Sequence, residues 1–447
     1  MQADPDEMIR RHRTQTLWMY FANIILGLWL LTSPAIFDYR SEQLAWSDAL
    51  SGALIVALGI VAFFPRGDFW GRWGICLVGT WLLFAPLIFW APTAFVYVND
   101  TLIGGLVISF SVLAPMMPGK AHHMAMMQPG PDVPPGWTYN PSSWWQRGPI
   151  IALGLISFLI SRYLAAYQLG HIDTVWDPFF KTGTARVLTS DVSKAWPVSD
   201  AGLGATSYLL EALSGFMGGI RRWRTMPWMV VMFGVLVVPL GITSIILVIL
   251  QPVMVGTWCT LCLTTALFML VMIPLAVDEI WAMVQFMLHT RREGKPMWRT
   301  FWIGGTIEGG SEDTRSPEFD GPRFPMVPSM VWGVTIPGNL LISALIGFWL
   351  MAAPPVFDST GTVANSDFLA GPLVAVIAVI AMAEVARPLR FINVVIGLWL
   401  VSTPWFLSGT TTGSTVNDIV AGLALIGLSL PRGSVRERYD GWQPYIV

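Results

Sequence analysis

Apolar segments of membrane-spanning length recur along almost the whole of this 447-residue chain. A transmembrane helix needs about 20 predominantly apolar residues, and about twelve segments approach or reach that length. They cover residues 17–36, 49–64, 73–91, 101–117, 148–167, 206–219, 227–250, 258–277, 332–353, 368–384, 389–406 and 416–430. Because 54% of the residues are hydrophobic and only 12% are charged, the chain fits no ordinary soluble class. We expect an all-α polytopic membrane protein.

The basic residues are distributed unevenly between the loops that join these segments. With the N-terminus placed inside, the inner loops contain most of the Lys and Arg, including residues 221–224 and 291–299. The outer loops contain Arg40, Lys181, Arg186 and Lys194. Positive charge is retained on the cytoplasmic side, so both termini are expected in the cytoplasm of a multi-pass protein of the plasma (inner) membrane. Lipid is the expected surrounding, and no nucleic-acid partner is expected. The net charge of -2 hides the asymmetry across the membrane and says nothing about nucleic acid.

One sequence unit occurs four times, in two pairs that flank the centre of the chain. Each copy reads G-x-W-L-x-x-x-P, then continues for 13 or 14 residues to an Asp that follows Ser or Asn and begins D-x-x-x-G. The first glycines are Gly27, Gly79, Gly347 and Gly397, and the acidic residues are Asp48, Asp100, Asp367 and Asp418. Each unit predicts a helical hairpin, in which the proline ends the outgoing helix and the glycines allow close helix contact.

The four aspartates have two interpretations. Placed at a loop-to-helix junction, each carboxylate is expected to cap the returning helix by accepting from its first free amides. The alternative is an ion site, because carboxylates in membrane segments are often functional. The units resemble the SPW repeat of bacterial membrane proteins, over residues 20–118 and 336–433. That resemblance implies a membrane module and no particular chemistry.

Two of the three cysteines, Cys259 and Cys262, stand at the start of an apolar run. Their spacing allows one helical turn or a tight bend to close a disulfide between them. A thiol at the first turn of a helix meets free backbone amides and the positive end of the helix dipole, which favour its thiolate. The pair is therefore a candidate redox centre at the outer face. The alternative is that both are small apolar residues of a helix.

Metal binding is not expected. Zinc at the cysteine pair would need about two further ligands, and His171 is the only histidine on the outer side. The adjacent His122 and His123 lie in a Pro-rich segment without further ligands nearby, which is a weak pattern for a soft metal. The third cysteine, Cys76, is expected on the opposite side of the membrane from the pair.

Residues 148–290 contain the cysteine pair and no repeat. Their expected order is an outgoing helix to residue 168, an outer segment, a returning helix, an outgoing helix to residue 250, and the helix headed by Cys259 and Cys262. This order resembles the vitamin K epoxide reductase family. A second segment agrees with it, through residues 186–190, 199–204 and Tyr208.

The resemblance implies a four-helix bundle that holds a quinone against the cysteine pair. In the family, the first cysteine faces a protein partner and the second faces the quinone. Cys259, nearer the solvent-facing helix start, would form a mixed disulfide with an extracytoplasmic thiol protein, and Cys262 would react with the quinone. Cofactor-binding positions would be Asp200, Leu203 and Ala266.

The chain departs from the family pattern at three points. The loop cysteines that pass electrons to a partner are replaced, in our register, by Trp176 and Thr184. Many members have Asn where this chain has Asp200, and Tyr where it has Ala266. Both of those side chains donate to the quinone oxygens in the family, and an ionised Asp cannot donate.

The expected organisation is a pair of repeats, a Pro-rich linker, the reductase-like bundle, a second linker that could dock a partner, and a second pair of repeats. The corresponding ranges are 1–119, 120–147, 148–293, 294–331 and 332–447. Two functions follow. The first is a quinone-linked thiol–disulfide oxidoreductase of the membrane. The second is a non-catalytic structural or assembly subunit of a membrane complex that uses the same fold as a scaffold.

Overall fold

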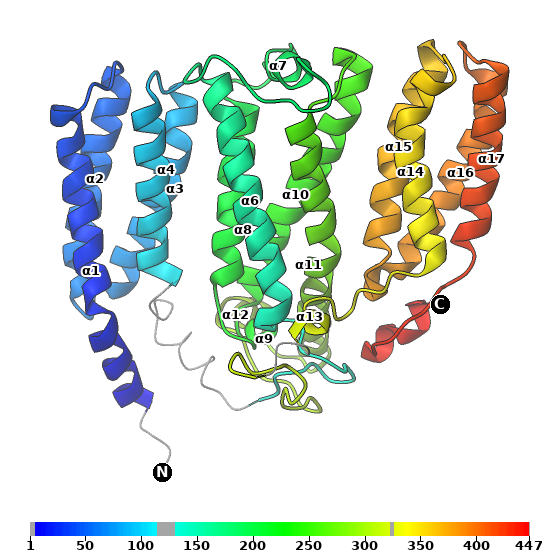
Figure 1. Ribbon diagram of the computed structural model, residues 1–447. Helices are drawn as coiled ribbons and strands as arrows, with labels where there is room; N and C mark the ends of the chain where they lie inside the picture. Colours follow the sequence, from blue (N-terminus) through cyan, green and yellow to red (C-terminus); the bar gives the residue numbers. More distant parts are fainter. Residues whose placement is uncertain (1–4, 114–129, 322–325, 447) are drawn as a thin grey trace.

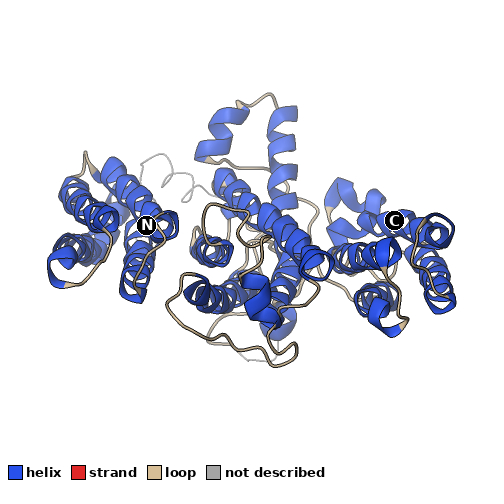
Figure 2. Cartoon of the chain, turned by 90° about the horizontal axis from the view of Figure 1, so that it is seen from above, coloured by secondary structure: helices blue, strands red, loops and turns tan. Residues whose placement is uncertain are grey.

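The computed structural model describes residues 5–113, 130–321 and 326–446, and all the regular elements in these residues are helices. The long helices stand side by side in three groups that lie in a row (Figure 1). Figure 2 shows the same row from above, with the central group between the two outer ones. The all-α prediction is confirmed.

The two outer groups are the repeat modules, and each consists of two helical hairpins. The first contains α1 (Pro5–Ile36), α2 (Glu42–Phe63), α3 (Asp68–Ile88) and α4 (Ala94–Ile108), which a π-helical turn, η1 (Ser109–Leu113), extends. The second contains α14 (Gly338–Val356), α15 (Gly361–Ile380), α16 (Ile392–Phe406) and α17 (Thr412–Ser429). In every copy the outgoing helix ends shortly after the repeat proline, as predicted.

The central group is a four-helix bundle with the predicted order. It contains α6 (Trp144–Gln168), α8 (Asp200–Phe216), α10 (Pro227–Leu250) and α11 (Thr260–Arg292). An outer segment, residues 169–199, joins α6 to α8 and includes the short helix α7 (Gly183–Leu188). A π-helical turn, η2 (Gln251–Val255), follows α10. The first repeat module packs against α8 through α3 and α4, and the second packs against α10 and α11 through α15.

Ten helical segments in the described part of the chain are long and apolar enough to cross a membrane. The shorter α8 and the more polar α17 complete the expected set of about twelve, because each runs beside a spanning helix (Figure 1). The chain is a multi-pass membrane protein. The two ends of the chain lie on the same face of the row, which we call the terminal face, and α7 lies on the opposite face, which we call the α7 face (Figure 1).

The repeat glycines bring helix backbones into direct contact, as the sequence predicted. A Cβ atom added to Gly52 would lie 2.6 Å from the carbonyl oxygen of Gly27, and one added to Gly422 would lie 2.5 Å from that of Gly397. The other two hairpins repeat the contact at 2.7 Å, between residues 79 and 104 and between residues 347 and 371. No larger residue fits without a backbone shift.

The prediction that the repeat aspartates cap helices is wrong. The returning helices begin two turns earlier, after Ser41, Thr93, Thr360 and Thr411. The aspartates lie inside the helices and are buried, at 0% or 1% exposure. Asp48 lies beside Asp100, and Asp367 beside Asp418. Ser41 and Thr411 cap α2 and α17 with their side chains, and each aspartate faces its counterpart from the neighbouring hairpin.

The last helix of the bundle extends beyond its expected end near Asp278 and Glu279. Both side chains are buried. Glu279 forms a two-point ion pair with Arg222 at 2.5 and 2.6 Å, and Asp278 accepts one hydrogen bond from Tyr139 at 2.6 Å. α11 therefore continues into a cap on the terminal face. The described parts of both linkers and the C-terminal tail pack there around Trp137, Trp223 and Tyr439, among others. His122 and His123 lie outside the described residues.

Candidate functional site

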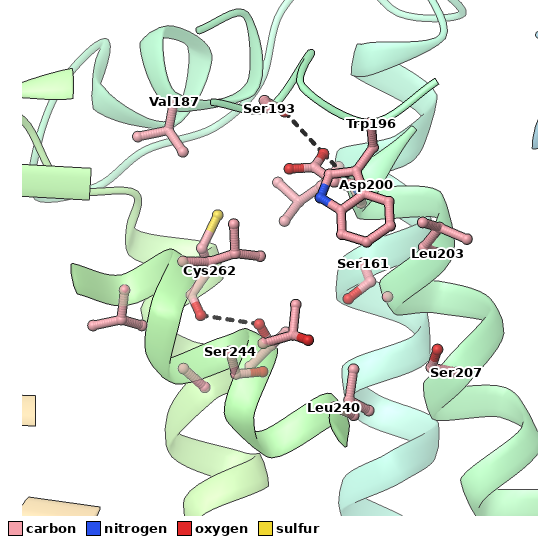
Figure 3. Close-up of a pocket in the computed structure, with 18 of the residues that line it drawn as sticks. Ser161, Val187, Ser193, Trp196, Asp200, Leu203, Ser207, Leu240, Ser244 and Cys262 are labelled. Carbon is pink, nitrogen blue, oxygen red and sulfur yellow. Dashed lines mark hydrogen bonds between the residues drawn. The ribbon is translucent and has the colours of Figure 1, made fainter. Parts of the chain in front are cut away.

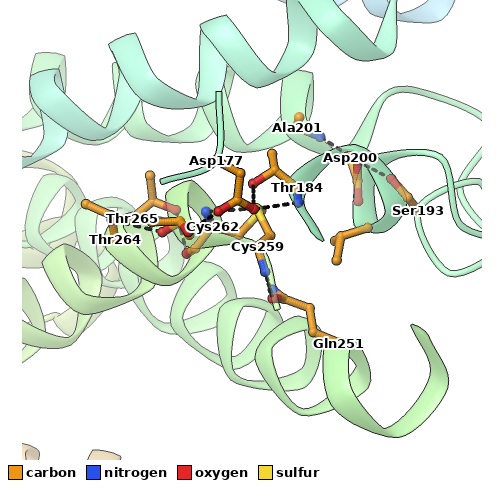
Figure 4. The surroundings of a disulfide bond; sticks show 12 residues. Asp177, Thr184, Ser193, Asp200, Ala201, Gln251, Cys259, Cys262, Thr264 and Thr265 are labelled. Atoms are coloured by element: carbon orange, nitrogen blue, oxygen red, sulfur yellow. Dashed lines mark hydrogen bonds between the residues drawn. A yellow bond between two sulfur atoms is a disulfide. The ribbon is translucent and has the colours of Figure 1, made fainter. Parts of the chain in front are cut away.

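Cys259 and Cys262 form a disulfide at the N-terminus of α11, with their Cα atoms 5.3 Å apart (Figure 4). Cys259 is the N-cap residue, and its sulfur accepts a hydrogen bond from the amide of Cys262 at 3.1 Å. When the bond is reduced, this amide and the helix dipole stabilise a thiolate on Cys259. Cys259 is therefore the better leaving group when a nucleophile attacks Cys262.

The two sulfur atoms differ in their surroundings. Cys259 is fully buried among apolar side chains that include Leu164, Leu188 and Leu261, and its amide donates to Gln251 at 2.8 Å. Cys262 is half-buried and lines a cavity. The expectation that Cys259 lies nearer the solvent is wrong, because the outer segment and α7 fold over the start of α11.

Asp177 fastens the outer segment to the cysteine motif (Figure 4). Its Oδ1 accepts from the hydroxyl of Thr260, the residue after Cys259, and from the amide of Phe180. Its Oδ2 accepts from the amide and the hydroxyl of Thr184 at 2.8 and 2.7 Å. Partial desolvation raises the pKa of the Asp177 carboxyl, but these donors outweigh it and hold the pKa well below its ordinary value. Asp177 is therefore ionised at neutral pH.

Close backbone contact also holds the outer segment against the cysteine motif. A Cβ atom on Gly183, at the start of α7, would lie 2.1 Å from the carbonyl oxygen of Trp258. Thr184, at one position expected to correspond to a loop cysteine, is buried and bonded to Asp177, whereas Trp176, at the other, is 63% exposed. Thr184 thus helps to hold the outer segment in place.

The cavity beside Cys262 has a volume of about 350 Å³ and lies between α6, α8, α10 and α11, beneath the outer segment (Figure 3). Asp200, Leu203 and Ala266, the three predicted cofactor-binding residues, all line it together with Cys262. Pockets for small molecules have volumes of roughly 300–1,000 Å³ and combine apolar walls with a few polar groups. This cavity has that character, since serine and threonine hydroxyls interrupt a largely aliphatic wall.

Asp200 is held as an acceptor at the edge of the cavity. Its Oδ1 accepts from Gln168 at 2.7 Å, from the hydroxyl of Ser193 at 2.9 Å and from the amide of Ala201 at 2.7 Å. These bonds tie the end of α6 and the outer segment to the start of α8. Asp200 therefore positions the cavity wall through an ionisable group, at the place where the family often has an amide.

Two residues of this site, Asp177 and Tyr208, were not predicted from the sequence. Asp177 was not singled out, although an Asp whose side chain accepts from amides two and three residues later, Phe179 and Phe180, is a recognisable turn signal. Tyr208 was noted only as part of a motif. Its buried hydroxyl donates to the carbonyl oxygen of Thr265, which joins α8 to α11 at the cavity wall.

Comparison with known families agrees with this architecture. Residues 149–277 match the vitamin K epoxide reductase family, and residues 17–114 and 339–431 match the SPW repeat domain. No curated protein and no solved structure matches the chain significantly. Both resemblances drawn from the sequence are confirmed. At the level of the family, the central domain supports a membrane protein of redox type.

Proposed function

We propose that the chain is an integral-membrane thiol–disulfide oxidoreductase whose Cys259–Cys262 pair exchanges two electrons with a quinone in the cavity beside Cys262. The observation that carries the proposal is the asymmetry of the disulfide. Cys262 opens on a ligand-sized cavity, whereas Cys259 is buried and stabilised as a leaving thiolate. A ligand-sized cavity at the accessible sulfur suits a redox site, whereas a scaffold role does not require one.

In the reduced pair, the Cys262 thiolate adds to a quinone carbon. The Cys259 thiolate then attacks the sulfur of Cys262, the carbon–sulfur bond breaks, and its electron pair passes to the quinone. The disulfide forms and the quinone becomes a hydroquinone, with the two thiol protons balancing its two new hydroxyl groups. The reverse sequence oxidises a hydroquinone.

Exchange with a protein partner needs a further step in this chain. The outer segment contains no cysteine, so a separate extracytoplasmic thiol protein has to reach the pair directly. Since Asp177 and Gly183 hold the outer segment over Cys259, that segment has to open first. This closed arrangement also favours the second candidate, a non-catalytic subunit of a membrane complex.

One experiment separates the two functions. The purified full-length protein is supplied with dithiothreitol and a naphthoquinone, and hydroquinone formation is followed by absorbance above the uncatalysed rate. Cys259→Ser and Cys262→Ser are each expected to abolish turnover, and Cys76→Ser, which removes the free cysteine in α3, is expected to retain it. If the double Ser variant still turned over quinone, or if the parent showed no turnover, the redox function of the cysteine pair would be excluded. The scaffold role would then remain.

A further inference from the structure

A second hollow, almost wholly apolar, lies beside the cavity at Cys262. It is a groove of about 370 Å³ between the central bundle and the second repeat module. Residues of α10 and α11 form one wall, and residues of α14 and α15 form the other. Side chains that line it include Ile245, Leu267, Phe348, Met351, Pro372 and Val376. We call it the repeat groove.

The repeat groove adjoins the cavity. Ser244, Val248 and Ala266 line both. Ala266 lies one helical turn after Cys262 on α11, so an extended chain that leaves the cavity beside Cys262 passes Ala266 on its way between α10 and α11. The methyl side chain at this position takes up less of the space between the two hollows than the tyrosine found here in many vitamin K epoxide reductases would.

The two hollows differ in chemistry. The cavity carries a carboxylate, several hydroxyl groups and the Cys262 sulfur. Ser244, which both hollows share, is the one residue with a polar side chain among those that line the repeat groove. A ligand that matches both therefore has a compact polar head and a long apolar tail.

We propose that the repeat groove holds the isoprenoid tail of the quinone whose head lies beside Cys262. The inference rests on the proposed redox function and gives the second SPW module a part in it, as one wall of the path between the bilayer and the site. That module also reaches the cysteine motif, since the ring of Trp258 packs edge-on against that of Phe368, with centroids 6.0 Å apart.

The test uses the full-length protein in lipid nanodiscs and a naphthoquinone that carries a photoreactive diazirine midway along its isoprenoid tail. After irradiation, digestion and mass spectrometry, adducts are expected on peptides of α14 and α15 that contain Phe348, Met351 or Val376. An excess of unlabelled long-tailed quinone is expected to prevent them. Met351→Trp and Val376→Trp, which fill the groove, are expected to lower this labelling several-fold.

Turnover provides a second readout. The same two variants are expected to raise the KM for a long-tailed quinone on the order of tenfold, which corresponds to about ten lost atom–atom contacts. The KM for the tail-less 2-methyl-1,4-naphthoquinone is expected to stay unchanged. Leu369→Trp, on the exposed lipid-facing surface of α15 and outside the groove, is the matched control and is expected to behave like the parent.

The outcomes separate this inference from the proposed function. Quinone turnover with adducts only elsewhere, or with adducts that filling the groove does not reduce, would overturn the repeat groove as the tail site. Adducts that phospholipid prevents and long-tailed quinone does not would assign the groove to an ordinary lipid chain and overturn the inference equally. Groove adducts without turnover of either quinone would instead remove the redox function and leave a binding site for the tail.

Discussion

At the scale of single residues, the chemistry depends on how two neighbouring sulfur atoms are divided between two environments. The N-cap position makes Cys259 the more stable thiolate, while burial keeps it from solvent. Cys262 has the opposite combination, because it lies within the helix but borders the cavity. The more stable thiolate is therefore on Cys259, whereas the more accessible sulfur is that of Cys262.

The first prediction concerns which thiol reacts first. After mild reduction, N-ethylmaleimide, which is small and membrane-permeant, is expected to modify Cys262 before Cys259, because access through the cavity outweighs the greater thiolate fraction of a sealed sulfur. Peptide mass spectrometry at short times measures the order. Earlier modification of Cys259 would mean that the outer segment opens readily, as a direct exchange with a protein partner requires.

The second prediction concerns Asp177. Asp177→Asn removes the charge that five hydrogen-bond donors surround and is expected to lower the free energy of unfolding by on the order of 1 kcal/mol, discounted for partial exposure. The pKa of Asp177 is depressed in the fold, so its contribution is complete above the unfolded value of about 4 and is lost as the pH falls further through the folded value.

Thermal unfolding in detergent at a series of pH values checks this. The difference between the parent and Asp177→Asn is expected to be constant from about pH 5 to about pH 8 and to shrink below about pH 4. Asp191→Asn, in the same outer segment and exposed, is the matched control and is expected to have no effect. A difference that grows in acid would contradict the sign of the linkage.

At the scale of elements, one hairpin design is used four times, and its marked residues serve contact between helices. The glycines remove side chains where two backbones meet, and the aspartates meet in pairs across neighbouring hairpins. Within lipid such small-residue contacts hold helices together without help from the hydrophobic effect. The hairpin is therefore a unit of packing, and the acid pair joins two of them.

The third prediction compares two glycines of α17. Gly422→Ala would place a methyl group 2.5 Å from the carbonyl oxygen of Gly397, whereas a methyl group at Gly427 has nothing within 4 Å. Gly422→Ala is expected to lower the free energy of unfolding by about 1–3 kcal/mol, and Gly427→Ala to leave it unchanged or raise it by up to about 1 kcal/mol. Unfolding followed by tryptophan fluorescence measures both. Equal effects would show that the close contact is not needed.

The fourth prediction concerns the acid pair of the first repeat module. Two buried carboxyl groups side by side are costly to ionise together, so we expect one of them to carry a proton that it can donate to the other. Asp100→Asn supplies a permanent donor to Asp48 and is expected to keep the stability of the parent. Asp100→Ala leaves Asp48 with Tyr39 alone and is expected to cost about 1–3 kcal/mol.

Thermal unfolding of the two variants measures this difference, and quinone turnover measures the rival interpretation. Both variants are expected to retain activity in proportion to their folded fraction. Should Asp100→Asn abolish turnover while the melting temperature stays unchanged, the structural account of the pair would be wrong and the ion role would return.

At the scale of the whole molecule, the sequence predicted the elements better than the contacts between them. Hydrophobic runs, repeat glycines and the order of the central helices led to the correct architecture, because each is a local or periodic signal. The burial of Asp48 and Cys259 could not be predicted, because both depend on segments distant in the chain. Asp48 is buried because α2 begins after Ser41, and Cys259 is buried because residues 169–199 fold over it.

The site shows the same division. Resemblance brought Asp200, Leu203, Ala266 and Cys262 together correctly as neighbours, although their roles remain predictions. It gave no indication of the repeat groove, since that hollow exists only where α14 and α15 pack beside α10 and α11. The sequence motifs of the reductase-like bundle and of the SPW repeat each describe one domain, so neither motif predicts how the two domains pack against each other.

The last prediction is the orientation of the molecule in the membrane. The structure places both termini on one face and the cysteine pair at the other, and the excess of Lys and Arg on the terminal face predicts that this face is cytoplasmic. Lys194 on the α7 face and Arg292 on the terminal face are both exposed, so each can carry a probe.

Single substitutions, Lys194→Cys or Arg292→Cys, are made in a Cys76→Ser background in which the Cys259–Cys262 disulfide stays intact. A membrane-impermeant maleimide is expected to label position 194 in intact cells and position 292 only after permeabilisation, because the reagent meets each thiol only from its own side. Strong labelling at 292 in intact cells would reverse the orientation. The redox pair would then face the reducing cytoplasm, where a disulfide does not persist, and the proposed exchange with an extracytoplasmic thiol protein would fail with it.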